Sequence, residues 1–288
     1  MVKEEMYVLS NGLSIPKLGF GTWFIEDANA AQAVRDAVGA GYRHIDTAQA
    51  YGNERGVGEG VNTCGLSRQE IFVTTKLAAE IKTYEEAVEA IDASLEKMGL
   101  DYIDLMLIHS PQPWTQFRED VRSFDEGNRQ AWKAMEDAYH AGKLKAIGVS
   151  NFEKEDLENL LSTCTVKPMV NQLLVHISNT PAELIAYNQA NEILVEAYSP
   201  IGHGEVLKNP KIQAMAEKYG VSAARLCIRY TLQLGLLPLP KTEKKDHMAD
   251  NADVDFVISE EDMQILTNIE QIKDYGEFGV FPVYGGKL

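Results

Sequence analysis

The chain alternates between short apolar segments and longer amphipathic ones, and this alternation restricts its fold more than any other feature. Eight apolar segments of strand length are each followed by a stretch with helical spacing. The predicted strands are residues 18–20, 44–46, 72–76, 103–109, 146–150, 169–173, 194–199 and 236–238. The predicted helices are residues 28–40, 54–62, 84–98, 128–141, 153–162, 181–190, 211–233 (broken near Tyr219-Gly220) and 245–251.

Apolar strands separated by helices favour a parallel sheet covered by helices. Eight such units close most naturally into a (β/α)8 TIM barrel. Before the first unit, residues 7–10 and 13–16 predict a β-hairpin with an Asn11-Gly12 turn, which we expect to close the bottom of the barrel. No linker or low-complexity segment interrupts the chain, so we expect residues 1–288 to form a single domain.

Charge and cysteine content limit the classes of binding partner and the cellular compartment that we expect for this protein. The 43 acidic side chains outnumber 27 basic ones, and the net charge of −16 disfavours nucleic acid or an anionic membrane as a partner. The sequence has no apolar run of about 18 residues and no signal-peptide pattern at its start. Cys64, Cys164 and Cys227 lack metal-ligand spacing. We therefore expect a reduced, cytoplasmic protein that holds no metal.

Polar residues stand at the ends of several predicted strands, which is where barrel enzymes of this kind carry their active sites. Asp46, Lys76 and His109 each end a strand, and Tyr51 follows Asp46 closely. Each has an ordinary explanation by itself, as a turn residue, a solvated lysine, a core histidine or a packing aromatic. Their coincidence on one rim of a barrel makes four independent explanations improbable, so we interpret them as one site.

These four side chains suit the reduction of a carbonyl group. A carbonyl that gains a hydride develops alkoxide character, so a nearby proton donor lowers the barrier. Tyr51 is the candidate donor, and the ammonium of Lys76 is expected to lower its pKa from the usual value of about 10. Asp46 is expected to hold Lys76 in place and charged, and His109 to orient the carbonyl.

One glycine-rich segment, Gly56-Val-Gly-Glu-Gly60, resembles a dinucleotide fingerprint but lacks its spacing and its preceding strand. We interpret it as a helix face that packs closely against the barrel. A nicotinamide cofactor would therefore bind here without a Rossmann fold.

The sequence resembles the aldo-keto reductase superfamily almost from end to end. The motifs that carry the resemblance are LGFGTW at 18–23, GYRHIDTAQAYGNE at 41–54, AIGVSNF at 146–152, NQ at 171–172, AYSP at 197–200 and LPKT at 239–242. It is similar to the small bacterial branch with diketogluconate reductases, glyoxal reductases and prostaglandin F synthase-like enzymes. The resemblance implies NAD(P)H-dependent reduction of aldehydes and ketones, with the cofactor extended across the rim of the barrel. Family members are often monomeric, so we expect a monomer.

The resemblance also implies roles for individual residues. Asp46, Tyr51, Lys76 and His109 match the four catalytic residues of the family. The positions that match cofactor contacts run from the nicotinamide to the adenosine phosphate: Ser150, Asn151, Gln172, Tyr198, Gly21, Thr22, Ser199, Ile201, Gly202, Lys241, Thr242, His247 and Asn251. We expect Trp23, Trp114 and Tyr275 to form an apolar wall for a small or medium aldehyde or ketone, and the aromatic loop 112–127 to be a substrate lid.

Cofactor choice depends on position 247, where the family commonly has arginine and this chain has histidine. Arginine offers a permanent charge and a planar fork for the 2′-phosphate, whereas histidine is only partly charged near neutral pH. We therefore expect a preference for NADPH, with usable NADH activity.

Two other readings remain open from the sequence. One is a barrel enzyme of the isomerase or aldolase class that uses Lys76 as a Schiff-base residue. The other is a non-catalytic nucleotide-binding sensor or structural barrel protein, against which the intact set of four catalytic residues argues.

Overall fold

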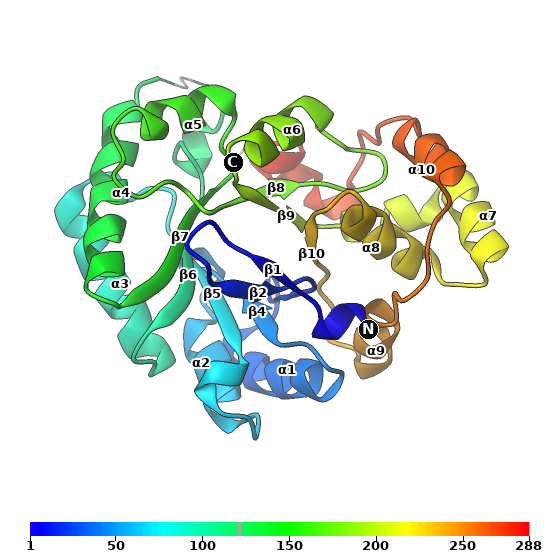
Figure 1. The fold of residues 1–288 in the computed structure, drawn as a ribbon, viewed down its shortest axis with the longest axis horizontal. Coiled ribbons are helices and arrows are strands. Elements are labelled where there is room, and N and C mark those ends of the chain that lie inside the picture. The colour runs from blue at the N-terminus through cyan, green and yellow to red at the C-terminus, as the bar shows by residue number, and fades with distance from the viewer. Residues whose placement is uncertain (120–121, 288) are drawn as a thin grey trace.

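A computed structural model describes residues 1–119 and 122–287. In this part of the chain, eight parallel strands form one sheet. The sheet curves into a barrel, and the helices lie outside it (Figure 1). The strands, in chain order, are β3 (Phe20–Gly21), β4 (His44–Asp46), β5 (Phe72–Leu77), β6 (Ile103–Ile108), β7 (Leu144–Ser150), β8 (Val170–Leu174), β9 (Leu194–Tyr198) and β10 (Leu237–Leu239). Each strand pairs in parallel with the next. The predicted (β/α)8 barrel is confirmed.

The first and last strands approach each other closely enough to close the barrel. The amide of Gly19 donates to the Pro238 carbonyl at 3.1 Å, and the amide of Gly21 donates to the Pro240 carbonyl at 3.0 Å. A Cβ atom at position 19 would lie 2.4 Å from Leu239 Cδ2. Glycine at position 19, just before β3, therefore leaves room for the Leu239 side chain of β10.

The helices that cover the sheet are α1 (Asp27–Gly39), α2 (Glu54–Thr63), α3 (Tyr84–Met98), α4 (Asp125–His140), α5 (Lys154–Leu161), α6 (Ala182–Ala190), α7 (Pro210–Tyr219), α8 (Ala223–Gln233), α9 (Lys245–Ala252) and α10 (Glu260–Thr267). The break predicted near Tyr219 is confirmed, because Gly220 adopts a positive φ of 64° and the Ser222 side chain caps α8. Helix α10, whose first turn carries three acidic residues, was not predicted from the sequence.

The glycine-rich segment lies in α2, as expected, but it packs against neighbouring helices rather than the barrel. Cβ atoms at Gly56 and Gly60 would lie 2.2 Å from the Asp27 carbonyl oxygen and 2.6 Å from Val34 Cβ, both on α1. A Cβ at Gly58 would lie 2.1 Å from the carbonyl oxygen of Met98, at the end of α3. The glycines therefore allow three helices to pack closely.

The hairpin of β1 (Met6–Val8) and β2 (Ser14–Pro16) lies across the end of the barrel at which the strands begin (Figure 1). Leu9 and Ile15 pack into the same buried cluster as the barrel residues Leu105 and Leu237. The turn differs from a two-residue Asn-Gly turn. The Gly12 amide donates to the Leu9 carbonyl, and Gly12 alone among the turn residues has a positive φ. Three residues therefore lie between Leu9 and Leu13, the last residues that pair beyond the strands, where the Leu9 amide donates to the Leu13 carbonyl at 2.9 Å.

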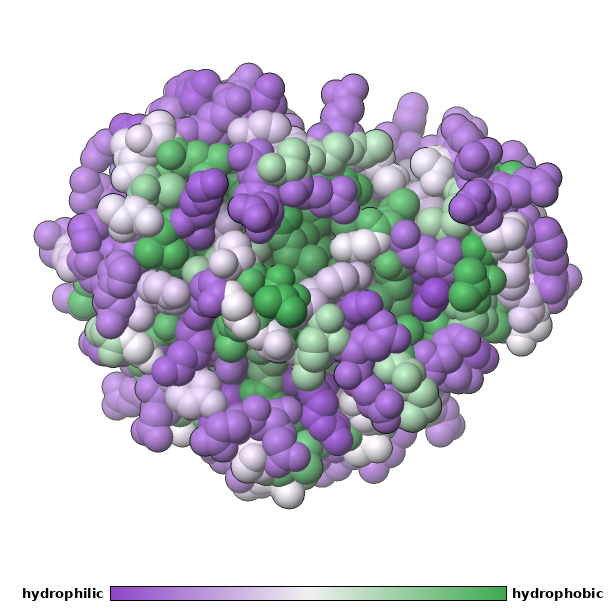
Figure 2. Space-filling view, in the orientation of Figure 1, coloured by the Kyte–Doolittle hydropathy of each residue, from purple (hydrophilic) through white to green (hydrophobic). Residues whose placement is uncertain are grey.

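The outer surface on the hairpin side is mostly hydrophilic around its edge, with apolar areas towards the middle (Figure 2). Met6 and Val8, on β1, contribute exposed apolar side chains there. Among the described residues, no helix is long and apolar enough to cross a membrane. Within the same residues, no group of three His, Cys, Asp or Glu side chains is placed to hold a metal ion.

Candidate active site

A cavity of about 300 Å³ opens at the carboxyl ends of the barrel strands. Thirteen of the residues predicted for the site line it: Gly21, Trp23, Asp46, Tyr51, His109, Trp114, Ser150, Asn151, Gln172, Tyr198, Ser199, Ile201 and Lys241. The structure therefore brings together residues from most of the strands, as the barrel topology predicts. Lys76 lies just behind the cavity wall, and its side chain is completely buried.

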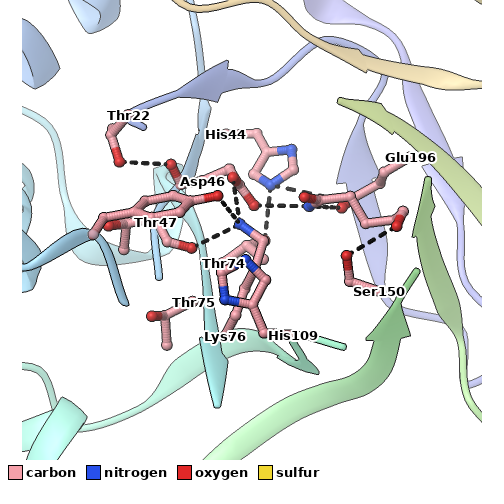
Figure 3. Close-up of polar contacts among 12 residues, drawn as sticks. Thr22, His44, Asp46, Thr47, Thr74, Thr75, Lys76, His109, Ser150 and Glu196 are labelled. Atoms are coloured by element: carbon pink, nitrogen blue, oxygen red, sulfur yellow. Dashed lines mark hydrogen bonds and ion pairs between the residues drawn. The ribbon is translucent and has the colours of Figure 1, made fainter. Parts of the chain in front are cut away.

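Lys76 connects the carboxylate of Asp46 to the hydroxyl group of Tyr51. Its Nζ atom donates to Asp46 Oδ1 at 2.7 Å, to the Thr47 carbonyl at 2.9 Å and to the Tyr51 hydroxyl oxygen at 3.3 Å (Figure 3). Three donated hydrogen bonds use all three hydrogens of an ammonium group. Because the Tyr51 oxygen accepts one of them, its own hydrogen is free to point elsewhere.

The protonation states follow from burial and from these contacts. Burial opposes the charge on Lys76, but Asp46 and Tyr51 outweigh it and raise the pKa of Lys76. Burial also raises the pKa of Tyr51, and the nearby Lys76 reverses only part of that rise. The expectation that Lys76 gives Tyr51 a net lowered pKa is therefore wrong for this structure. Desolvation of the phenol is the larger effect, so Tyr51 keeps its proton at neutral pH.

His109 lies next to Tyr51, with ring centroids 5.6 Å apart at 74°. Burial and the positive charge of Lys76 hold the pKa of His109 well below its usual value. The imidazole is therefore neutral at neutral pH and carries one N–H donor. Its Nδ1 atom is buried and has no hydrogen-bond partner among the described residues.

The amide side chains predicted at the nicotinamide end form one network. Asn151 donates to the His109 carbonyl at 3.1 Å, and its Oδ1 accepts from the Tyr198 hydroxyl at 2.8 Å. Ser150 Oγ donates to the Gln172 carbonyl at 2.9 Å. Asn151 and Ser199 have positive φ values of 61° and 49°, which turn the chain sharply at the ends of β7 and β9.

Beneath the cavity, the barrel interior contains a second carboxyl group that sequence reasoning missed. Glu196, on β9, is completely buried and accepts from Gln172 Nε2 at 2.8 Å (Figure 3). The same Nε2 donates to Asp46 Oδ2 at 2.9 Å. A charged residue two positions before Tyr198 in an apolar strand was the available signal, because residues i and i+2 of a strand face the same side.

The C-terminal segment covers the cavity with aromatic rings. Phe278 and Phe281 pack on Trp23, with ring centroids 6.3 and 5.0 Å away, and both line the cavity. His203, which had no predicted role, stacks on Phe278 at 3.9 Å. The expectation that Tyr275 belongs to the apolar wall is wrong: its hydroxyl group contacts His176 Nε2 at 2.9 Å, outside this cavity.

The loop 112–127 contributes one aromatic side chain to the cavity; residues 120 and 121 lie outside the described part of it. Trp114 packs edge-on against His109, with ring centroids 5.0 Å apart. Phe117 packs on Trp114 but does not line the cavity. Arg118 anchors the loop, donating to the Asn151 carbonyl at 2.6 Å and contacting Asp156 at 3.1 Å.

At the far end of the site, Lys241 lines the cavity, and its ammonium contacts Glu243 at 3.2 Å. His247 is exposed on α9, one turn before the buried Asn251. Residues four apart share a helix face, so both lie on one side of α9. The remaining predicted contacts, Thr22, Gly202, Thr242, His247 and Asn251, are not among the residues that line this cavity. Thr22 is buried, and its hydroxyl donates to the Asp46 carbonyl.

The polar groups that line the cavity fit a nicotinamide dinucleotide. Ser150, Asn151 and Gln172 place hydroxyl and amide groups at one end, where a carboxamide would need them. The Tyr198 ring lies beside them, and the Lys241 ammonium at the other end suits a phosphate.

Comparison with known proteins agrees with this geometry. Residues 17–271 match the Aldo/keto reductase family. The chain is 40% identical over 275 residues to glyoxal reductase from Bacillus subtilis, with 95% of each chain covered. It is 40% identical over 273 residues to 9,11-endoperoxide prostaglandin H2 reductase from Trypanosoma cruzi, covering 93% of this chain and 92% of that one.

Solved structures show the same fold. An aldo/keto reductase from Brucella melitensis superposes with a TM-score of 0.87 at 37% identity, covering 94% of this chain and 99% of that one. A Bombyx mori aldo-keto reductase in complex with NADP gives a TM-score of 0.84 at 33% identity, with 97% of each chain covered. The resemblance found in the sequence is confirmed: this chain belongs to the aldo/keto reductase family and is an NAD(P)H-dependent oxidoreductase that uses NADPH.

Proposed function

We propose that this enzyme reduces small or medium aldehydes and ketones to alcohols, with Tyr51 as the general acid. The observation that carries the proposal is the continuous contact from Asp46 through Lys76 to the Tyr51 hydroxyl at the wall of the cavity. Lys76 donates to the phenol oxygen and stabilises the negative charge that forms there as the proton leaves. Asp46 keeps Lys76 charged and fixed.

The substrate carbonyl is held between Tyr51 and His109, whose rings meet at the cavity. The neutral His109 donates a hydrogen bond to the carbonyl oxygen and turns it towards Tyr51. Bound NADPH supplies the hydride that the carbonyl carbon accepts. Tyr51 then passes its proton to the oxygen, which becomes the alcohol hydroxyl.

We propose that the cofactor lies along the cavity in the direction set by the polar groups that line the cavity. Ser150, Asn151 and Gln172 hold the carboxamide, and the ring of Tyr198 stacks on the nicotinamide. Around the pyrophosphate and ribose we place Gly21, Thr22, Ser199, Ile201 and Gly202. The adenosine-phosphate end is assigned to Lys241, Thr242, His247 and Asn251.

The substrate end of the cavity is apolar. Trp23, Trp114, Phe278 and Phe281 form its wall, which favours a substrate with a hydrophobic substituent. The relative named glyoxal reductase makes dicarbonyl compounds the first substrates to test. We further propose that residues 1–288 act as one domain and as a monomer, because all four proposed catalytic side chains come from one chain. A cytoplasmic location is proposed because Cys64, Cys164 and Cys227 are all free thiols.

A substrate screen tests the proposal. Consumption of the dihydronicotinamide is followed with glyoxals, benzaldehydes and keto sugars, with NADPH and NADH in parallel. Turnover with at least one carbonyl class supports the proposal, and binding of NADPH without turnover of any class favours the nucleotide-sensor reading. Borohydride trapping of substrate on Lys76 would favour an aldolase-type enzyme, which the buried, fully hydrogen-bonded ammonium argues against.

A further inference from the structure

Glu196 is a carboxyl group that the proposed chemistry does not use, buried inside the barrel directly below the active site. Val195 and Ala197 face outward into the cluster that contains Ile185 of α6, so Glu196 faces inward. Its exposed fraction is zero. Its Oε2 accepts one hydrogen bond from Gln172, while its Oε1 has no partner among the described residues.

The groups that face Glu196 do not compensate a negative charge. From β4 come Asp46 and His44. Burial raises the pKa of Asp46, but its Oδ1 lies 2.7 Å from the Lys76 ammonium, which favours the charged form there. His44 Nε2 lies 3.9 Å from Glu196 Oε1 and contacts Thr74 Oγ1 at 2.8 Å. Burial, aided by Lys76, lowers the pKa of His44 to about 3, so this imidazole is neutral.

The remaining neighbours add no free cation. From β5 comes Lys76, which is engaged with Asp46. The flanking strands β8 and β10 contribute Gln172 and the apolar Leu237 and Leu239, and Tyr198 stands above Glu196 on β9. Burial, together with the charge of Asp46, raises the pKa of Glu196 to about 8.

Gln172 links this carboxyl group to the site. Its Nε2 has two hydrogens, and both are used, by Asp46 Oδ2 at 2.9 Å and by Glu196 Oε2 at 2.8 Å. Because Gln172 also lines the cavity, its Oε1 is the side-chain atom left to accept a hydrogen bond there. The two carboxyl groups together fix which end of the amide faces a ligand.

We propose that Glu196 is a positioning residue: as a buried neutral acid it holds the Gln172 amide in the orientation that presents Oε1 to the carboxamide of the cofactor. A neutral Glu196 also leaves the Lys76 ammonium paired with the Asp46 carboxyl group, 2.7 Å away. The part of this inference that concerns the carboxamide rests on the proposed function, whereas the neutral state of Glu196 does not.

The neutral state is tested on the ligand-free protein with Glu196→Gln. A group whose folded pKa lies above its unfolded pKa stabilises the fold at low pH and loses that contribution as pH rises through the folded value. Relative to Glu196→Gln, the parent should therefore lose resistance to urea steadily from about pH 5 to about pH 9.

The positioning role is tested by direct binding of NADPH. Glu196→Met removes the acceptor for Gln172 and leaves a buried N–H unsatisfied, so we expect the dissociation constant to rise roughly tenfold. Glu196→Gln retains a carbonyl oxygen at that position and should rescue most of the lost affinity. The matched control is Glu136→Gln, which replaces a buried carboxyl group on α4 outside the barrel and should bind NADPH as the parent does.

The outcomes separate the two proposals. Equal pH dependence in the parent and Glu196→Gln would show that Glu196 is ionised, which overturns the inference. Parent-like NADPH affinity in Glu196→Met would show that Glu196 does not position Gln172, which also overturns it. Failure of the parent to bind NADPH would instead contradict the proposed function, and the urea measurement would still decide the protonation state.

Discussion

The ammonium of Lys76 donates a hydrogen bond to the hydroxyl oxygen of Tyr51 at 3.3 Å. The hydroxyl hydrogen of Tyr51 is not used in this contact. This direction matters for the proposed role of Tyr51 as general acid, because a phenol that accepts from Lys76 can release its proton towards the cavity. The charge that then develops on its oxygen lies beside a cation already held by Asp46. The arrangement therefore suits the proposed proton transfer before any substrate is present.

Lys76→Met should abolish most of the activity while preserving the Tyr51 hydroxyl group. We expect kcat to fall roughly 10²- to 10⁴-fold, because the departing proton would leave an unstabilised phenolate. The variant should also unfold more easily, by about 3–5 kcal/mol, since Asp46 becomes a buried charge without its partner. Steady-state kinetics and urea unfolding measure the two effects.

The double variant Lys76→Met with Asp46→Asn separates them. It should regain stability, because no unpaired charge remains, but it should not regain activity. Recovery of turnover in the double variant would mean that the low activity of Lys76→Met came from misfolding.

The barrel and most of the cavity could be predicted from the sequence because both depend on local patterns. Asp46, Lys76 and His109 lie at or close to the ends of apolar strands, and in a barrel such positions converge on one rim. The end of a helix at Gly220 could also be predicted from the sequence, since glycine tolerates the positive φ that ends a helix. These features depend on periodicity and on backbone preferences.

Other features depend on which distant surfaces meet, and the sequence did not contain that information in readable form. Phe278 and Phe281 follow the last barrel strand by some distance in the chain, and nothing local shows that they fold back onto Trp23. The pKa of Tyr51 was predicted in the wrong direction for a related reason. The effect of Lys76 can be inferred from proximity, whereas the opposing effect of burial requires the packed structure.

Trp114→Ala should change the order in which substrates are preferred and leave NADPH affinity unchanged. The Trp114 ring lines the cavity beside His109, at the substrate end. An apolar contact of this kind contributes roughly 1–3 kcal/mol of discrimination. Values of kcat/KM for a series of aldehydes measure it, with Phe124→Ala as the control in the same loop, because Phe124 does not line the cavity. An unchanged series in Trp114→Ala would remove the loop from substrate selection.

His247→Arg should tighten NADPH more than NADH. The 2′-phosphate that distinguishes the two cofactors is held best by a permanent, planar cation, which arginine provides. We expect the parent to prefer NADPH by a smaller margin than the variant. Dissociation constants for both cofactors, measured at mildly acidic and mildly alkaline pH, test this. Equal tightening of NADPH and NADH would place residue 247 away from the 2′-phosphate.

Glu243→Gln should act at the same end of the site by another route. Glu243 contacts the Lys241 ammonium at 3.2 Å and would compete with a phosphate for it. Removing that carboxylate should strengthen NADPH binding, within the range of about 1 kcal/mol expected for an exposed ion pair. Weaker NADPH binding in Glu243→Gln would show that Glu243 holds Lys241 in place for the cofactor.

Lys82 should make the stability of the protein depend on pH in the alkaline range. Its ammonium donates to the Ser110 carbonyl and to Asn128, and burial lowers the pKa of Lys82 to about 7, against the attraction of Glu80 and Asp156. The unfolded chain then holds this proton to a higher pH than the folded chain, so stability rises with pH from about 7 to about 10.

Lys82→Met lacks the titrating group and removes this dependence. The free energy of unfolding of the parent should therefore gain at least about 1 kcal/mol relative to the variant across that range. Parallel curves for the two proteins would show that Lys82 stays charged in the folded state.

Tyr51→Phe tests the central claim most directly, because it removes one oxygen atom and its proton and little else. NADPH affinity, measured by direct titration, should stay close to that of the parent, since the hydroxyl group is not assigned to the cofactor. Carbonyl reduction, measured as NADPH consumption with the best substrate of the screen, should fall roughly 10²- to 10⁴-fold. Near-parental turnover by a Tyr51→Phe variant that binds NADPH normally would contradict the account, because the proton would then come from another group.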